Sequence, residues 1–275
     1  MSWRLEIEKQ KRFNFGRNWI NYSNTLNQSQ IKKAEDSLKE VFDVKNFNEK
    51  DFIDIGSGSG IFSLAAVNLG AKVLSFDYDE DSVKSTKFLK SLYHKDNVKW
   101  RIESGSVLDE KYLESLGKFD YVYSWGVLHH TGDLKKALVN ASQMVKESNS
   151  EVVIAIYNDQ GIKSKIWKII KKIYCLGGFF SFILRFIFIP YFFLKYIFIG
   201  IIKYKDPTTP FKYYKKKRGM HIYFDWIDWL GGYPFEVATP EMIFNVFHSR
   251  GFTLEKLTCT IRSGCNEYRF KKGSI

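Results

Sequence analysis

The sequence contains only three cysteines, Cys175, Cys259 and Cys265, and they lack the spacing of a metal site. An odd number of cysteines without such spacing indicates a reducing compartment. We therefore expect no zinc site and no other metal. The first residues contain no apolar run, so we also expect no secretory signal and a cytoplasmic protein. Internal repeats and low-complexity tails are absent as well.

The net charge of +12 is confined to one part of the 275-residue chain. Residues 160–224 contain fourteen Lys and Arg against a single acid, Asp206, whereas the remainder contains 28 basic and 29 acidic residues. The same segment holds the most apolar stretch of the sequence. A nucleic-acid groove normally mixes basic with polar residues. Basic residues among apolar and aromatic ones indicate an anionic lipid surface instead, so nucleic acid is not the expected partner.

Apolar runs bounded by turn residues alternate with helical patterns along the first 160 residues. Helices are expected at 29–42 (capped by Ser29), 61–69, 80–93 and 133–146, and strands at 51–56, 73–76, 98–102, 119–124 and 151–157. This alternation predicts an α/β fold of the Rossmann-like kind, with a mostly parallel sheet covered by helices on both faces.

The chain returns to this pattern after an insertion. Thr239 and Pro240 are typical of a helix start, and two final strands at 253–260 and 265–271 form a hairpin, which makes the last strand antiparallel and completes a seven-stranded sheet. We expect an N-terminal helical segment at 1–50 and a cofactor-binding core at 51–159. A basic and aromatic helical insertion follows at 160–235, and a C-terminal helix with the hairpin at 236–275.

The strongest motif is Asp54-Ile-Gly56-Ser57-Gly58-Ser-Gly60 at the end of the first strand. Glycines let the backbone turn sharply and approach a ligand closely, and the following helix offers free N–H groups. A dinucleotide site has the spacing G-x-G-x-x-G. Here the spacing is G-x-G-x-G behind an acid, which favours a ligand with a cationic part, such as an α-amino group and a sulfonium. The alternative is a tight strand-to-helix turn without a ligand.

Asp77 closes the second strand about twenty residues after the glycines. An acid at this place accepts both hydroxyls of a ribose. The alternative is a solvated aspartate in the turn that follows. Further candidates stand after the third strand, in Gly105–Asp109, and after the fourth, in Ser124–His130. Open α/β sheets bind ligands at these carboxyl ends.

With these motifs the chain resembles the class I S-adenosylmethionine-dependent methyltransferases over residues 40–160 and 236–271. Proteins of that family also have an antiparallel last strand. The resemblance implies S-adenosyl-L-methionine as cofactor, with Ser106 in place of the family's common adenine-side acid. It implies cofactor contacts from Asp54, Gly56, Ser57, Gly58, Gly60, Asp77, Tyr78, Ser106, Val107, Trp125 and Gly126.

A looser similarity is to the ubiquinone-pathway polyprenyl-phenol O-methyltransferases and to related methyltransferases that accompany glycan-assembly enzymes. It rests on residues 156–161, on the amphipathic insertion and on the Pro240-Glu241 helix start. The resemblance implies O-methylation of a hydroxyl on a small-molecule, glycan or lipid-linked acceptor. The open alternatives are an N-methyltransferase acting on a small amine, and a non-catalytic scaffold that keeps the cofactor fold at a membrane.

Two histidines follow the fourth strand, where the transferred methyl group is expected. An oxygen nucleophile benefits from a base, and His is suited to that role at neutral pH. His129 and His130 are therefore the catalytic candidates, and the alternative for each is a packing or capping role. Acceptor contacts are also conceivable for four further residues, with plain surface roles as the alternative: His221, Asp225, Asp228 and Asn266.

The insertion contains a candidate membrane-docking element at 163–204. It begins with a basic amphipathic helix and continues with twelve aromatics between Tyr174 and Tyr204. Arg185 and Lys195 keep every uncharged run below the roughly eighteen residues of a spanning helix, and Pro190 is expected to break the middle. We expect peripheral docking on the inner membrane surface or a lid over the site; an internal cap packed on the sheet is the alternative.

Overall fold

The computed structural model describes residues 3–9, 12–23, 26–218, 222–260 and 264–273. These residues divide into two compact units. One comprises Phe15–Ser164 and Phe235–Ile275, and the other comprises Met1–Asn14 and Lys165–Pro234. The structure thus separates the first fourteen residues from the rest of the segment 1–50, which the sequence pattern treats as one. We call the two parts the sheet unit and the helical unit.

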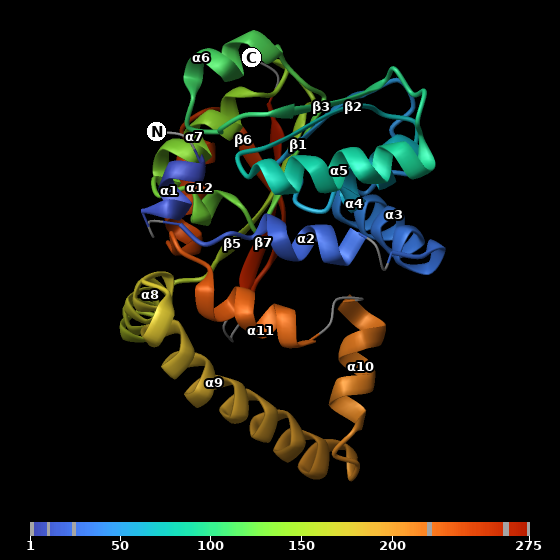
Figure 1. Ribbon diagram of the computed structural model, residues 1–275. Helices are drawn as coiled ribbons and strands as arrows, with labels where there is room; N and C mark the ends of the chain where they lie inside the picture. The colour runs from blue at the N-terminus through green and yellow to red at the C-terminus, as the bar shows by residue number, and fades with distance from the viewer. Residues whose placement is uncertain (1–2, 10–11, 24–25, 219–221, 261–263, 274–275) are drawn as a thin grey trace. The chain divides into compact units, whose positions relative to one another are not determined.

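The sheet unit is built on seven strands in the order β3-β2-β1-β4-β5-β7-β6 (Figure 1). The strands are β1 (Asp51–Ile55), β2 (Lys72–Asp77), β3 (Trp100–Ser104), β4 (Tyr121–Trp125), β5 (Glu151–Tyr157), β6 (Phe252–Thr258) and β7 (Cys265–Lys272). β1 to β5 pair in parallel, and β7 pairs antiparallel with both β5 and β6. The predicted mixed sheet with an antiparallel last strand is confirmed.

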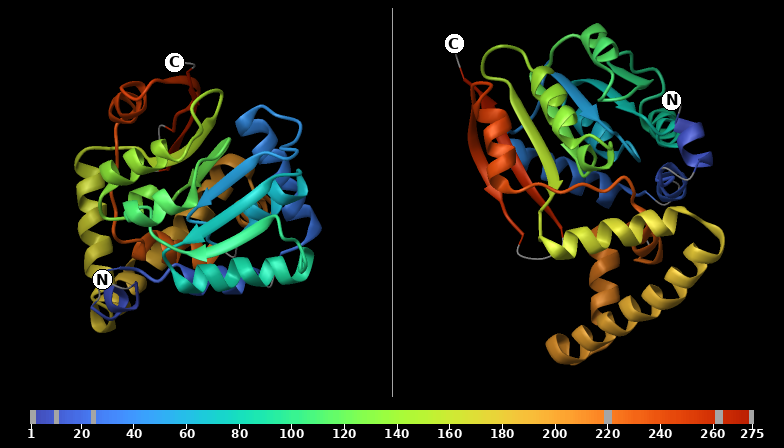
Figure 2. Two further views of the ribbon diagram at one scale, coloured as in Figure 1. Left: turned by 90° about the horizontal axis from the view of Figure 1, so that it is seen from above. Right: turned by 90° about the vertical axis from the view of Figure 1, so that its left-hand side faces the viewer.

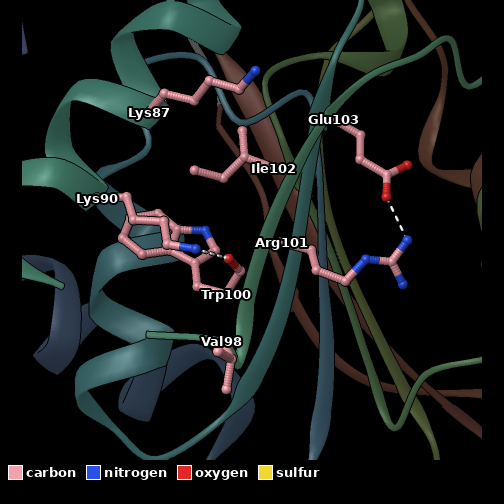
Figure 3. Close-up of a pocket in the computed structure, with 7 residues that line it drawn as sticks. All are labelled: Lys87, Lys90, Val98, Trp100, Arg101, Ile102 and Glu103. Carbon is pink, nitrogen blue, oxygen red and sulfur yellow. Dashed lines mark hydrogen bonds and ion pairs between the residues drawn. The ribbon is translucent and has the colours of Figure 1, made fainter. Parts of the chain in front are cut away.

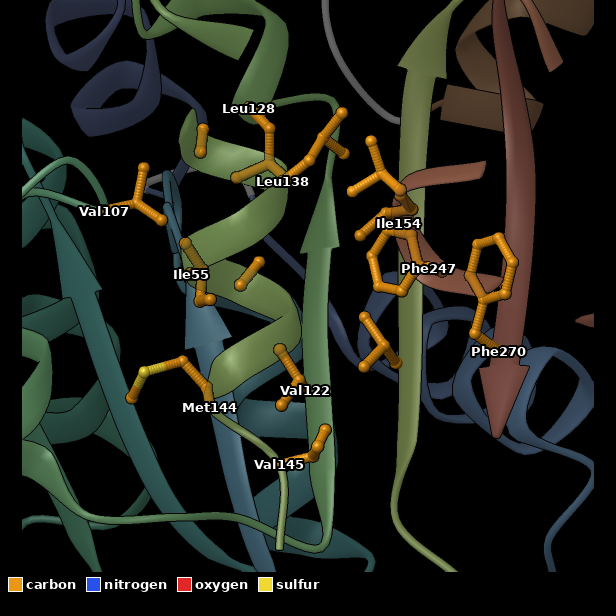
Figure 4. Packing of buried hydrophobic residues seen from close by; sticks show 14 of the residues in the cluster. Ile55, Val107, Val122, Leu128, Leu138, Met144, Val145, Ile154, Phe247 and Phe270 are labelled. Atoms are coloured by element: carbon orange, nitrogen blue, oxygen red, sulfur yellow. The ribbon is translucent and has the colours of Figure 1, made fainter. Parts of the chain in front are cut away.

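Helices cover both faces of the sheet, because side chains of a buried strand alternate between the faces. Phe52 packs into the layer of α3, α4 and α5, whereas Ile53 packs into the layer of α6, α7 and α12. In the second layer the rings of Phe247 and Phe270 stack with centroids 4.2 Å apart (Figure 4). The helices of this unit are α2 (Gly16–Ser23), α3 (Gln28–Phe42), α4 (Ile61–Asn68), α5 (Glu80–Tyr93), α6 (Glu110–Leu116), α7 (Leu134–Gln143) and α12 (Pro240–His248).

Two local predictions need correction. The cap of α3 is Asn27 rather than Ser29, because the Asn27 carboxamide accepts the N–H of Gln30 and the Gln30 side chain accepts the N–H of Asn27. The third strand begins at Trp100 rather than at Val98. Asn97 forms a turn in which its side chain accepts the N–H of Lys99, so Val98 remains outside the sheet and exposed.

The helical unit is built from α1 (Trp3–Glu8), α8 (Ile162–Cys175), α9 (Gly178–Ile199), the short π-helix η2 (Gly200–Tyr204), α10 (Thr209–Arg218) and α11 (Ile222–Gly231) (Figure 2). Its buried cluster centres on Tyr174, Phe192, Trp226 and Leu230. The expectation that Pro190 breaks the apolar segment is wrong, because α9 continues through it. A proline inside a helix removes one N–H donor, and long apolar helices tolerate that loss.

Candidate functional site

The glycine loop turns the chain from β1 into α4 at the carboxyl end of β1. Gly56, Gly58 and Gly60 all have positive φ, of 78°, 55° and 82°. A Cβ atom on Gly56 would lie 2.2 Å from Val127, so only glycine fits there. The N–H groups of Gly56 and Ser57 are bonded to the carbonyl of Phe76, which joins the loop to the end of β2. The loop is thus a fixed cradle whose three glycines carry no side chains of their own, and the side chains of Val127, Trp19 and Thr86 lie against them.

Asp54 lies beneath this loop at the end of a chain of hydrogen bonds. Its carboxylate accepts the Ser63 hydroxyl at 2.5 Å, and the Ser75 hydroxyl donates to Ser63 at 2.7 Å. The indole of Trp100 donates to Ser75 at 2.8 Å, so the chain reaches the edge strand. Burial raises the pKa of Asp54 to about 6, and the Ser63 hydrogen bond opposes that rise. The carboxylate is therefore positioned by the sheet rather than by solvent.

Asp77, at the end of β2, reaches back to the loop. One carboxylate oxygen accepts the N–H of Gly58 and the other accepts the N–H of Asp79, each at 2.9 Å. Burial raises the pKa of Asp77 to about 7, against the effect of these two donors. Each oxygen retains a second lone pair, so the carboxylate still has the capacity to accept two hydroxyl groups. Tyr78 follows at the start of the turn and is half-buried.

The helix α2 contributes residues that the sequence analysis did not single out as functional. The N–H of Gly16 donates to the Asp79 carboxylate at 2.7 Å, while Asp79 also caps α5. The indole of Trp19 lies over the glycine loop, 3.3 Å from where a Cβ of Gly58 would be. α2 packs along α5 (Figure 1). The aromatic character of residues 13–22 was the only available signal, and it did not indicate contact with the loop.

The remaining cofactor candidates follow β3 and β4, and they differ in how far they are buried. Ser106 is half-buried, and its hydroxyl accepts the N–H of Leu108. Val107 is buried in the hydrophobic core (Figure 4), so its side chain faces the sheet layer rather than the front. Trp125 is 41% exposed, and its indole donates to Glu267 at 3.1 Å. Gly126 has a φ of 75° and its N–H is bonded to Ala155.

The two histidines have different surroundings. His129 is fully buried, and its Nδ1 accepts the backbone N–H of Tyr157 at 3.4 Å. An imidazole whose Nδ1 is an acceptor is neutral there. His130 is only half-buried, and its ring lies between Phe15 and Tyr157 with centroids 4.9 Å and 5.7 Å away. His130 is therefore the more exposed of the two, whereas His129 is bonded to the end of β5.

The structure describes three of the other suggested acceptor contacts. Asn266 is buried, and its carboxamide accepts the N–H of Thr260, which ties the ends of β6 and β7 together. Asp225 and Asp228 lie on α11 in the helical unit, and His221 lies outside the described residues. In the described ranges, no group of three or more His, Cys, Asp or Glu side chains could hold a metal ion.

A separate open cavity of about 420 Å³ lies on the outer edge of the sheet, between α5 and β3 (Figure 3). Trp100 and Ile102 line it, and Lys87 and Lys90 stand at one side. Arg101 is turned away towards Glu103, with which it forms an ion pair (Figure 3). This cavity is not at the carboxyl ends of the strands, so it is not part of the candidate site.

Comparison with known proteins identifies the central part of the chain. Residues 53–149 match the family model described as "Methyltransferase domain". The ubiquinone biosynthesis O-methyltransferase of Pelagibacter ubique is 25% identical over 153 residues, which cover 56% of this chain and 57% of that protein. The ribosomal protein L11 methyltransferase of Prochlorococcus marinus is 33% identical over 126 residues, covering 45% of this chain and 40% of that protein. The chain thus spans about half the length of these curated relatives.

The fold is also found among solved structures. The magnesium protoporphyrin IX methyltransferase of Synechocystis, solved with bound SAH, superposes with a TM-score of 0.53 at 13% identity. The superposition covers 98% of this chain and 93% of that one. At this level of identity the likeness establishes the Rossmann-like fold alone.

Proposed function

We propose that this chain is a class I S-adenosylmethionine-dependent methyltransferase that transfers a methyl group to a hydroxyl oxygen of a small-molecule, glycan or lipid-linked acceptor. The observation that carries the proposal is the cradle formed by the loop of Gly56, Gly58 and Gly60 together with Asp77, which hydrogen-bonds to the middle glycine. The proposed cofactor is S-adenosyl-L-methionine, and three features of this cradle fit it.

The three glycines of the loop have positive φ and carry no side chains, so the loop backbone itself offers its polar groups to a ligand. Asp77 retains lone pairs for the two ribose hydroxyls of a nucleoside. Asp54, held by Ser63 under the loop, supplies negative charge near a cationic amino acid part. Bound there, the cofactor supplies an electrophilic methyl group on a sulfonium.

The protein's own contribution to the reaction is positioning and proton removal. In-line displacement requires the nucleophile to be held near the methyl carbon in a dry site. The rings of Phe15 and Tyr157 flank His130 and provide apolar surroundings. His130 is the proposed base for the proton of an acceptor hydroxyl, because histidine is suited to that role at neutral pH. His129 fixes the backbone of Tyr157 and so positions one wall of this site.

The experiment is a methyl-transfer assay with tritiated-methyl S-adenosylmethionine. Parallel panels of acceptors would contain phenols, sugars and polyprenyl phenols on one side and amines of similar size on the other. We expect label in the hydroxyl panel, and a base-stable ether product for the phenols. Label transferred to amines alone would overturn the O-methyl proposal. Failure of calorimetry to detect cofactor binding would overturn the methyltransferase proposal as a whole.

A further inference from the structure

The helix α9, continued by η2, is apolar over its whole length. Gly178–Tyr204 forms 27 helical residues, and its most apolar stretch of 18 residues has a mean hydropathy of 1.9 with only 6% of that stretch buried. By length and composition alone it could cross a membrane. Soluble proteins do not leave so many large apolar side chains in contact with water without a partner. Such a helix therefore needs a partner for whichever of its faces is not packed within the protein.

One side of α9 is already covered within the helical unit. Residues at every fourth position, Leu184, Phe188, Phe192 and Tyr196, pack towards α11, where Phe192 and Tyr196 each lie within 6 Å of the Trp226 ring centroid. A spacing of four residues keeps side chains on one face of a helix. This face packs against the rest of the helical unit and holds α9 in place.

The opposite side of α9 is exposed. We call it the outward face and define it by its large exposed side chains: Phe179, Phe182, Phe186, Ile187, Phe193, Leu194 and Phe198. Ile201 and Ile202 of η2 are exposed in the same way. A helix that is apolar on all sides normally has all sides buried. The outward face therefore lacks the partner that its composition requires.

Charges are excluded from the outward face. Within Gly178–Ile199, all of which the structure describes, the only charged side chains are Arg185 and Lys195. At about 100° per residue, both fall towards the packed side rather than on the outward face. Arg185 is held there, because its Nε donates to the Tyr174 hydroxyl at 2.7 Å. The outward face is thus uncharged over about six turns.

Exposed basic side chains lie on the preceding helix α8 and at the far end of the apolar stretch. Lys165, Lys168 and Lys172 are exposed on α8, next to Ile166 and Ile169, which are also exposed. Lys203 and Lys205 are exposed at the far end of the apolar stretch. An anionic lipid surface has hydrocarbon beneath a layer of phosphate groups. Apolar side chains can enter the hydrocarbon while the flanking lysines bind the phosphates. A second copy of the chain would bring like charges together instead.

The packed face argues against a transmembrane orientation. If α9 crossed the bilayer, α11 would enter the hydrocarbon with it, together with Asp225 and Asp228. Burying carboxylates in hydrocarbon is strongly unfavourable. An orientation in the plane of the membrane buries the outward face and leaves α11 on the water side.

We propose that the outward face of α9 docks flat on an anionic lipid bilayer, with the lysines of α8 and η2 contacting the headgroups. Docking in this plane brings the enzyme to acceptors that reside in the membrane. That consequence rests on the proposed methyltransferase function, whereas docking itself does not depend on it.

The test is flotation of the full chain with vesicles of phosphatidylcholine alone and with added phosphatidylglycerol. We expect binding to the anionic vesicles that persists at moderate salt, because the buried Phe side chains do not depend on charge. The variant F182D/F186D should lower the partition coefficient about 10-fold or more, since two large apolar contacts are replaced by charges that the anionic surface repels. The control L92D/V98D places the same charges on exposed apolar positions of the sheet unit and should bind normally.

Several outcomes would overturn the proposal. The first is that the protein does not float with anionic vesicles at low salt, and the second is that F182D/F186D and the control bind equally. The third is that the bound protein resists extraction with alkaline carbonate, which would indicate a spanning helix. A dimer in light scattering that F182D/F186D abolishes would assign the face to a second copy. Far-ultraviolet circular dichroism checks that both variants are folded. Calorimetry with S-adenosylhomocysteine separates this result from failure of the proposed enzymatic function.

Discussion

The carboxylate of Asp77 accepts the backbone N–H of Gly58 at 2.9 Å, so the acid that ends β2 and the middle glycine of the loop form one rigid structure. A ligand that bonds to Asp77 therefore meets the loop in a defined place. This relationship makes Asp77 the residue at which the cofactor proposal is most directly tested.

Replacing Asp77 by Ala should weaken binding of S-adenosylhomocysteine by about 2 kcal/mol, or about 30-fold, because charge-assisted hydrogen bonds to ribose are lost. Isothermal titration calorimetry measures the change. Asp96→Asn provides the control, since Asp96 is an exposed carboxylate near the sheet edge. Equal affinities for the wild type and Asp77→Ala would remove Asp77 from the site.

The affinity for cofactor should depend on pH through the same carboxylate. Burial raises the pKa of Asp77 to about 7, and only the ionised form accepts two hydroxyls without giving up a lone pair to its own proton. The ionised fraction falls as pH decreases, so affinity should decrease about 10-fold between pH 8 and pH 6. The isosteric variant Asp77→Asn should show a flat profile. A wild-type profile that is equally flat would contradict the prediction.

Replacing His130 should affect turnover, whereas replacing His129 should affect stability. His130→Ala should lower kcat about 10²–10⁴-fold with little effect on stability, as expected for loss of a general base. His129→Ala should lower the free energy of unfolding by about 2 kcal/mol, because it empties a buried position and leaves the N–H of Tyr157 without its acceptor. Steady-state kinetics and denaturant unfolding distinguish the two. Normal turnover of His130→Ala would place the base elsewhere or show that positioning suffices.

Lys171 in α8 is buried, and its Nζ donates to the carbonyl of Trp229. Burial lowers its pKa to about 7, whereas an unfolded lysine titrates near 10.4. The unfolded chain therefore binds more protons between these values, and wild-type stability should rise as pH increases from 7 to 10. Lys171→Met should remove this slope and stabilise the protein by roughly 1–2 kcal/mol at pH 6. Urea unfolding at pH 6 and pH 9 tests it, with the exposed Lys172→Met as control.

Local patterns allowed much of the sheet unit to be predicted. The span of α5 and the start of α12 at Thr239 and Pro240 follow from capping chemistry that acts within a few residues. The start of β3 was misplaced because the turn at Asn97 depends on a side-chain hydrogen bond that competes with β pairing at Val98.

The contribution of α2 could not be predicted from the sequence. Gly16 and Asp79 are 63 residues apart, and neither local propensity nor periodicity indicates that one binds the other. The placement of Trp19 over Gly58 is of the same kind. Likewise, the adjacent His129 and His130 are equivalent in sequence, and only tertiary packing distinguishes the buried one from the accessible one.

The hydrogen-bond chain from Trp100 through Ser75 and Ser63 to Asp54 joins the outer edge of the sheet to the centre of the site. Each hydroxyl in this chain accepts one proton and donates another, so the orientation of all the donors is set from one end. A change in the ionisation of Asp54 would reverse or release these dipoles and alter the field at a buried indole. The surroundings of the buried Trp100 indole thus depend on the charge state of an acid at the opposite end of the chain of hydrogen bonds.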